Sequence, residues 1–394
     1  MIRICASIRT SFDGTPDVRG SPLKRVLFRL HWLAGISAGL VLGLVGFTGG
    51  LLGLEQPVLS WLNPALQVSA DGRLPLTPDR WVAAARAAMP EHGTRSIAWE
   101  GPEHAVGMRM VRVGARPTEI AIDPYSGVVL GEERGTAFFA TVEQLHRNLA
   151  AGPVGKQIVG ASTALIFVFL TTGLYLRWPR RARSPSAWLR VNTAAKGRGF
   201  WWQLHAVVGT WLLIPYLLAA ATGLWWSYDF YRNAVNGFAG VPTPARRGPP
   251  NDAPAAVPLD AAWVSFLREA PDAVRANIST SLAADGALEI RYQTAASPHD
   301  RAWDSLKLDP VDGTVRSREP YAELPRGRRF VSSLFPLHSG SWFGFPGRVV
   351  AAIAALLMPL FALSGVWMWL LRRRGDALRR NAAWAQPQLD AGID

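Results

Sequence analysis

The chain has 394 residues, of which 49% are hydrophobic and only 18% are charged. Its mean hydropathy of +0.10 is too high for an ordinary water-soluble enzyme. The formal net charge is +13, and Cys5 is the single cysteine. One cysteine excludes an internal disulfide, a zinc site ligated by cysteines, an iron–sulfur cluster and the CxxCH attachment of a c-type haem.

Four long uncharged stretches predict helices that span a membrane. They cover residues 30–54, 157–176, 199–228 and 349–371. Each holds about 20 residues or more, the length a helix needs to cross about 30 Å of hydrocarbon. A polar leader precedes the first stretch and no small-residue cleavage site ends it, so we interpret it as an anchor and not as a signal peptide.

Basic residues gather on one side of these spans. Segments 1–29, 177–198 and 372–394 hold 18 basic and 5 acidic residues, a net charge of +13, whereas segments 55–156 and 229–348 hold 24 of each. The positive-inside rule then predicts a cytoplasmic location for both termini. Membrane topology explains the excess of basic residues in these segments, so we expect no nucleic-acid partner. The arginines expected to anchor the spans are Arg177, Arg180, Arg181, Arg183 and Arg372 to Arg374.

Two external segments are each predicted to fold as a small α+β domain. Each has a helical stretch, "LTPDRWVAAARAAMP" or "VPLDAAWVSFLREAP", then short strand-like runs and a closing turn, "DPYSGVVLGEE" or "DPVDGTVRSRE". A proline-rich linker at 241–258 precedes the second domain. The expected boundaries are a leader at 1–24, spans at 25–54 and 200–228, external domains at 55–140 and 229–333, histidine-bearing segments with their spans at 141–178 and 334–371, a cytoplasmic loop at 179–199 and a tail at 372–394.

The two halves of the chain form an internal repeat. When His31 is aligned with His205, glycine recurs four residues later and Thr-Gly at positions +17 and +18. When His146 is aligned with His338, glycine recurs at +6, +9 and +27. Parallel repeats in membranes are related by an axis along the membrane normal. We therefore expect a four-helix transmembrane bundle in which His31 faces His205 on the cytoplasmic side and His146 faces His338 on the external side. The alternative is that His146 and His338 lie deeper in the membrane, so that the two histidines of one repeat meet each other.

Opposed histidines in a helical bundle are typical of haem ligation. A planar macrocycle fits between helices, and its iron takes one imidazole nitrogen from each side. Without CxxCH the haem would be b-type, and two pairs predict two haems per chain, one near each membrane face. Ionisable groups at membrane depth are functional by default, which favours ligands over four unrelated interfacial histidines. Glycines expected to make room for the ring are Gly35, Gly39, Gly209 and Gly223, and arginines placed to meet propionates are Arg25, Arg29 and Arg348.

Other features receive simpler interpretations. His92, His104 and His299 have no repeat partner, so we expect them at the surface and expect no zinc site. A Thr-Gly or Ser-Gly pair occurs in every span, and we interpret it as a close helix-packing position in preference to a role in holding the macrocycle. The pairs are Thr48-Gly49, Thr172-Gly173, Thr222-Gly223 and Ser364-Gly365. An aromatic belt is predicted from Trp201, Trp202, Trp225 and Trp226.

Nucleotide-binding and hydrolase motifs are missing from the sequence: there is no strand-linked G-x-G-x-x-G, no P-loop and no nucleophile elbow. The predicted cytoplasmic segments leave no room for a flavin or nicotinamide domain. An electron donor is therefore expected to be another molecule, either a quinol or a reductase protein.

The arrangement of span, external domain with "IDPYSGVVLGE" or "LDPVDGTV", Leu-His and span resembles the PepSY-associated transmembrane family of Gram-negative inner membranes. The resemblance covers residues 22–375. That family includes dihaem reductases that reduce ferric siderophores in the periplasm. The resemblance thus implies a ferric-chelate reductase whose ligands are His31, His146, His205 and His338.

Two other functions compete with this one. PepSY domains elsewhere resemble protease propeptide inhibitors, so the chain could instead be a non-enzymatic binding or regulatory protein with a periplasmic partner. A small-solute transporter is disfavoured, because four spans without an intramembrane carboxylate offer little for ion coupling.

Overall fold

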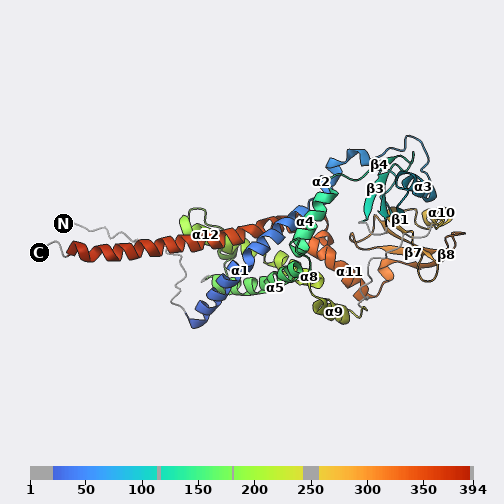
Figure 1. Ribbon diagram of the computed structural model, residues 1–394. Helices are drawn as coiled ribbons and strands as arrows, with labels where there is room; N and C mark the ends of the chain where they lie inside the picture. Colours follow the sequence, from blue (N-terminus) through green and yellow to red (C-terminus); the bar gives the residue numbers. More distant parts are fainter. Residues whose placement is uncertain (1–20, 113–116, 180–181, 243–256, 391–394) are drawn as a thin grey trace, which may run out of the picture.

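The computed structural model describes residues 21–112, 117–179, 182–242 and 257–390, with the side chains of 379–390 left aside. Long helices lie at one end of the molecule and an antiparallel sheet at the other (Figure 1). The helices that lie between these parts include α4 (Thr136–Asn148) and α11 (Arg326–Ser339) (Figure 1). Most of the proline-rich linker, residues 243–256, lies outside the described residues.

Three helices in the described ranges are long and apolar enough to cross a membrane: α1 (Pro22–Leu52), α5 (Gly152–Arg177) and α12 (Gly344–Asp390). A fourth span exists if α7 (Gly197–Trp211) and α8 (Leu213–Ser227) count as one, although they meet at a bend of 62°. The sequence predicts a single span here. Pro215 explains the break, because its ring cannot donate a hydrogen bond to the carbonyl four residues earlier. The described residues therefore contain three or four helices that are able to span a membrane.

The spans pack closely around α1. This helix lies against α12 and α5, while α5 contacts α8 and α7 contacts α12. A Cβ added to Gly46 would overlap Met358, so glycine allows α1 and α12 to approach each other. The buried residues of this core are Ala38, Leu42, Ile166, Val208, Leu212, Tyr216, Ala220 and Ala354.

The arginines predicted to anchor the spans lie in different environments. Arg177 at the end of α5 donates hydrogen bonds to the carbonyls of Ala206 (2.7 Å) and Trp188 (2.6 Å), which ties α5 to α7 and to α6 (Pro185–Leu189). Arg183 and Arg372 to Arg374 are exposed, whereas Arg180 and Arg181 lie outside the described residues. Helix α12 continues without a break past Arg372, the residue at which the sequence predicts the start of a cytoplasmic tail.

The external segments form one eight-stranded antiparallel sheet in the order β4-β3-β2-β1-β5-β6-β7-β8. This differs from the two separate domains that the sequence predicts. The reason lies at β1 and β5, where Ile97 pairs with Ile278 and both side chains are fully buried. Pairing these two strands removes an open edge from each half. The strands are β1 (Gly93–Trp99), β2 (Val106–Val111), β3 (Thr118–Ile122), β4 (Val129–Gly131), β5 (Ala273–Ser279), β6 (Leu288–Thr294), β7 (Asp304–Leu308) and β8 (Val315–Glu319).

Two helices cover this sheet, α3 (Pro78–Ala88) and α10 (Asp260–Glu269). Trp81 of α3 and Phe266 of α10 belong to a single core with the buried side chains of both halves of the sheet. The sequence of elements is the same in each half: one helix, four strands, a histidine-bearing helix and a span. The remaining elements are α2 (Glu55–Leu62), η1 (Pro64–Leu66), α9 (Asp229–Phe238), η2 (Tyr321–Glu323) and η3 (Ser341–Phe343).

Candidate functional site

Four histidines meet in two pairs with the same geometry. The ring centres of His31 on α1 and His205 on α7 are 6.2 Å apart, and the ring planes are inclined by 67°. The rings of His146 on α4 and His338 on α11 show the same separation and the same angle. The pairs expected from the repeat are thus brought together by helices that lie far apart in the sequence.

The first pair is held by hydroxyl groups on α5 and α12. Nδ1 of His31 lies 2.8 Å from Oγ1 of Thr172, and Nδ1 of His205 lies 2.8 Å from Oγ of Ser364. Each hydroxyl already donates its single hydrogen to a carbonyl of its own helix, that of Val168 for Thr172. The hydroxyl oxygen must therefore accept from the imidazole, so the hydrogen of each ring is on Nδ1.

The second pair is held by α1 and α8. Nδ1 of His146 donates to the carbonyl of Val45 at 2.8 Å, with Oγ1 of Thr48 at 3.5 Å. Nδ1 of His338 lies 3.0 Å from Oγ1 of Thr222 and 3.1 Å from the carbonyl of Ala219. A carbonyl can only accept, so Nδ1 carries the hydrogen here as well.

All four rings consequently present an unprotonated Nε2. Within the described part of the chain, no hydrogen bond reaches the Nε2 of these histidines. A neutral imidazole whose Nδ1–H is fixed by an acceptor is the usual form of a metal ligand in proteins.

Glycines lie directly against three of the four histidine rings. A Cβ at Gly173 would lie 3.3 Å from Cε1 of His31, and a Cβ at Gly223 would lie 3.3 Å from Cε1 of His338. At Gly49 the distance to Cε1 of His146 would be 2.8 Å. The Thr-Gly pairs therefore hold histidines, which corrects their interpretation as helix-packing positions. The pattern is incomplete at Gly365, where an added Cβ would meet nothing within 4 Å.

Aromatic rings border the pairs. The ring of Phe169 lies 5.4 Å from that of His31, and Phe361 lies 5.1 Å from His205. Sequence reasoning missed both residues, although each stands three positions before a Thr-Gly or Ser-Gly pair. Trp226, which is predicted as part of a belt, lies 5.6 Å from His338.

The glycines expected to make room for a ring divide into two groups. Gly35 borders open space, since an added Cβ would have nothing within 4 Å. Gly39 instead faces Ala362 at 3.5 Å, and Gly209 faces Phe361 at 3.4 Å. Gly223 lies against His338, so Gly35 is the one of these four glycines that borders open space, and its role beside a macrocycle stays a prediction.

The three arginines proposed to meet propionates lie in different settings. Arg25 and Arg29 are exposed near the start of α1. Arg348 instead pairs with Asp300 of the sheet part, with 3.6 Å between the guanidinium and the carboxylate.

The other histidines are not all at the surface. His104 is exposed and His92 is half-buried, but His299 is only 6% exposed, so its predicted surface location is wrong. Nε2 of His299 donates to the hydroxyl of Tyr321 at 3.0 Å, and its ring lies 5.0 Å from that of Trp342. Burial lowers the pKa of His299. Among the described residues, no cluster of three or more His, Cys, Asp or Glu side chains could hold a metal ion.

Comparison with known proteins identifies the family. None of the curated proteins matches the chain at a significant level. The family model of the PepSY-associated TM region matches residues 28–372, which include the sheet, the four paired histidines and all of the spanning helices except the start of α1 and the end of α12. The chain therefore belongs to the family of proteins with a PepSY-associated transmembrane region.

Proposed function

We propose that the chain is an oxidoreductase that binds two b-type haems, one at each histidine pair, and moves electrons across the inner membrane to a ferric chelate. The observation that carries this proposal is the repetition of one geometry at two sites. Each site combines a ring separation of 6.2 Å with Nδ1 atoms held by acceptors.

The ring separation fits a metal between two imidazoles. A metal–imidazole bond is about 2.0 Å long and the bonded nitrogen is about 1.1 Å from its ring centre, so imidazoles on opposite faces of one iron have centres about 6.2 Å apart. Both pairs have this separation.

Residues of the chain prepare each imidazole for ligation. The acceptors on Nδ1 fix the tautomer, hold the ring plane and increase the basicity of Nε2. Phe169 and Phe361 cover the first pair with apolar surface. We assign Arg25 and Arg29 to the propionates of this haem, since guanidinium groups bind carboxylates strongly.

The two sites are separated by about the thickness of a bilayer. Thr48, which contacts His146, follows His31 by 17 residues on α1. At 1.5 Å per helical residue this is about 26 Å, against about 30 Å of hydrocarbon. When bound, haem b supplies a one-electron couple at each end of this distance.

The proposed topology follows from repeat and charge. Two repeats form a four-helix bundle in which α7 and α8 together make the third span. The arginine-rich ends face the cytoplasm of a Gram-negative bacterium, and the sheet lies in the periplasm.

The reaction is a one-electron reduction of each ferric ion. Fe(II) is held less strongly than Fe(III) by hard oxygen ligands, so reduction favours release of the metal from a siderophore. A quinol that gives two electrons would reduce two ferric chelates and release two protons. A reductase protein in the cytoplasm is the other class of donor.

Electron transfer can be tested in liposomes that contain the purified protein. Dithionite is trapped inside, Fe(III)–citrate is added outside, and ferrozine reports external Fe(II). We expect Fe(II) to appear, and His338→Ala to lower the rate to that of protein-free liposomes. His92→Ala, which changes a histidine outside both pairs, should keep the wild-type rate.

Equal rates for the His338→Ala and His92→Ala variants would contradict this function. They would favour a non-enzymatic binding or regulatory protein, for which the paired histidines are dispensable.

A further inference from the structure

A cavity of about 470 Å³ lies where the sheet meets the start of α12. Its wall combines residues after β1, residues of β5 and β6, and residues beside α12. This volume is within the range of small-molecule sites. Its polar lining includes Arg275, Thr294, Ser297, Asp300, Ser341 and Arg348.

One wall of the cavity is a loop that is longer in the second half of the chain. Nine residues (295–303) connect β6 and β7, whereas six residues (112–117) connect β2 and β3. Asp300 in this loop accepts a hydrogen bond from Oγ of Ser341 at 2.9 Å and pairs with Arg348. This loop thus forms the wall of the cavity that contacts the start of α12.

The cavity is rich in hydrogen-bond donors. Glu100 lies 3.3 Å from the guanidinium of Arg275, and Asp300 holds Arg348, so each arginine is positioned by a carboxylate while retaining further N–H groups. Oγ1 of Thr294 and Oγ of Ser297 each accept a backbone N–H, which leaves the hydroxyl hydrogens to donate. Such a lining suits a solute with an oxygen-rich surface. The two carboxylates balance the charge of the two arginines, so binding relies on directed N–H and O–H groups, which anionic oxygens accept most strongly.

A short stretch of chain links the cavity to the second histidine pair. Ser341 follows His338 by three residues, so their Cα atoms are at most about 11 Å apart. Trp342 stacks on His299 of the loop and fixes this part of the wall.

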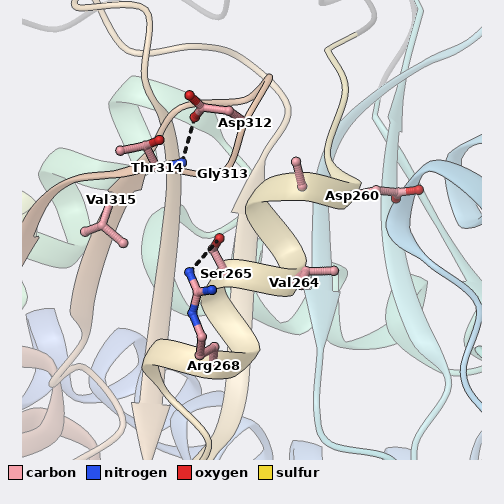
Figure 2. Close-up of a pocket in the computed structure, with 9 residues that line it drawn as sticks. Asp260, Val264, Ser265, Arg268, Asp312, Gly313, Thr314 and Val315 are labelled. Atoms are coloured by element: carbon pink, nitrogen blue, oxygen red, sulfur yellow. Dashed lines mark hydrogen bonds between the residues drawn. The ribbon is translucent and has the colours of Figure 1, made fainter.

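We infer that this cavity receives the ferric chelate, as an anionic complex with oxygen ligands, next to the His146–His338 pair. The identity of the metal rests on the proposed function, while the preference for an anionic chelate rests on the lining. A larger cavity of about 620 Å³ lies between α10 and residues 312–315 and includes Arg268, which contacts Ser265 (Figure 2). It provides a control on the same sheet.

Binding can be separated from reduction with Ga(III)–citrate, because Ga(III) is not reduced under these conditions. Titration calorimetry on the purified full-length protein should show that Arg275→Gln and Arg348→Gln each raise the dissociation constant about tenfold, the effect of one lost charge-assisted hydrogen bond. Arg268→Gln in the larger cavity should leave it unchanged. Absorption spectra of the same samples report haem content.

Several results would overturn the inference: equal binding of metal-free citrate, equal weakening by Arg268→Gln, or loss of haem from the Arg348→Gln variant, which would assign Arg348 to a propionate. A haem-free protein that binds Ga(III)–citrate through Arg275 and Arg348 would support the cavity and refute the proposed electron transfer.

Discussion

An imidazole can bind a metal through Nε2 only while its hydrogen is held on Nδ1. Thr172 achieves this for His31 because its own hydrogen is donated to Val168, which leaves the hydroxyl oxygen as an acceptor. Valine has the same shape as threonine but no acceptor. Replacing Thr172 by valine therefore removes the hydrogen bond to His31 and keeps the packing.

We expect Thr172→Val to weaken retention of the haem at the His31–His205 pair by about 10- to 100-fold, the usual effect of losing a partner of a ligand. The haem at the other pair should be unaffected. Transfer of haem to excess apomyoglobin, followed by absorbance, measures the loss.

Thr171→Val is the matched control. Thr171 is exposed and its hydroxyl also donates within the helix, to Phe167, but it does not contact His31. If both variants release haem at the same rate, Thr172 has no role in holding the ligand.

At the scale of elements, helices α3 and α10 meet at their N-termini. The N–H of Asp79 donates to Oδ1 of Asp260 at 2.9 Å, and the N–H of Leu259 donates to Oδ1 of Asp79 at 3.1 Å. Each carboxylate thus accepts from the start of the other helix, where negative charge is favourable. The two carboxylates are also close to each other, and burial together with Asp260 raises the pKa of Asp79.

This contact predicts a pH-dependent effect of Asp79→Asn. A raised carboxyl pKa means that the folded state binds its proton more tightly than the unfolded state, so ionisation of Asp79 destabilises the fold at neutral pH. The asparagine oxygen can still accept from Leu259. We expect a higher melting temperature for the variant at pH 7, with a gain that disappears as the pH falls to the ordinary aspartate value of 3.8.

Differential scanning fluorimetry from pH 7 to pH 3.5 measures this gain, with Asp272→Asn, a change at an exposed carboxylate of the same sheet part, as the control. A gain of equal size at both ends of the pH range would show that ionisation of Asp79 is not its cause.

Elements differ in how far the sequence determines them. Uncharged stretches predict the spans because the bilayer imposes length and apolarity on each one separately. The joining of β1 to β5 could not be predicted, since alternation within a strand shows which face is buried but not which strand is its neighbour. The bend before Pro215 could have been predicted from the proline itself. Hydropathy alone does not reveal it, because the stretch is apolar on both sides of the bend.

The candidate site was predictable to a similar degree. Repeat symmetry is sufficient to pair His31 with His205 and His146 with His338, because equivalent positions must face each other. The role of Thr172 and Thr222 as partners of histidines depends on which helix faces which, and this requires the structure. The burial of His299 likewise arises from Trp342, a contact between segments with no common pattern.

At the scale of the whole molecule, the two halves differ where the repeat alone would make them alike. Both provide one partner to each histidine pair, so the bundle is nearly symmetric at its proposed haem sites. Only the second half has the longer β6–β7 loop that contacts Ser341 and Arg348. This asymmetry gives the sheet one distinct face beside α12, where we propose that the ferric chelate binds.

Haem content per chain tests the central proposal most directly. The pyridine haemochromogen absorbance of detergent-purified protein, divided by protein concentration, should give two b-type haems for the wild type. It should give about one for His146→Ala or His338→Ala, and two for His92→Ala. Protein that remains colourless after expression with added haem, or two haems in the His338→Ala variant, would contradict ligation by these pairs.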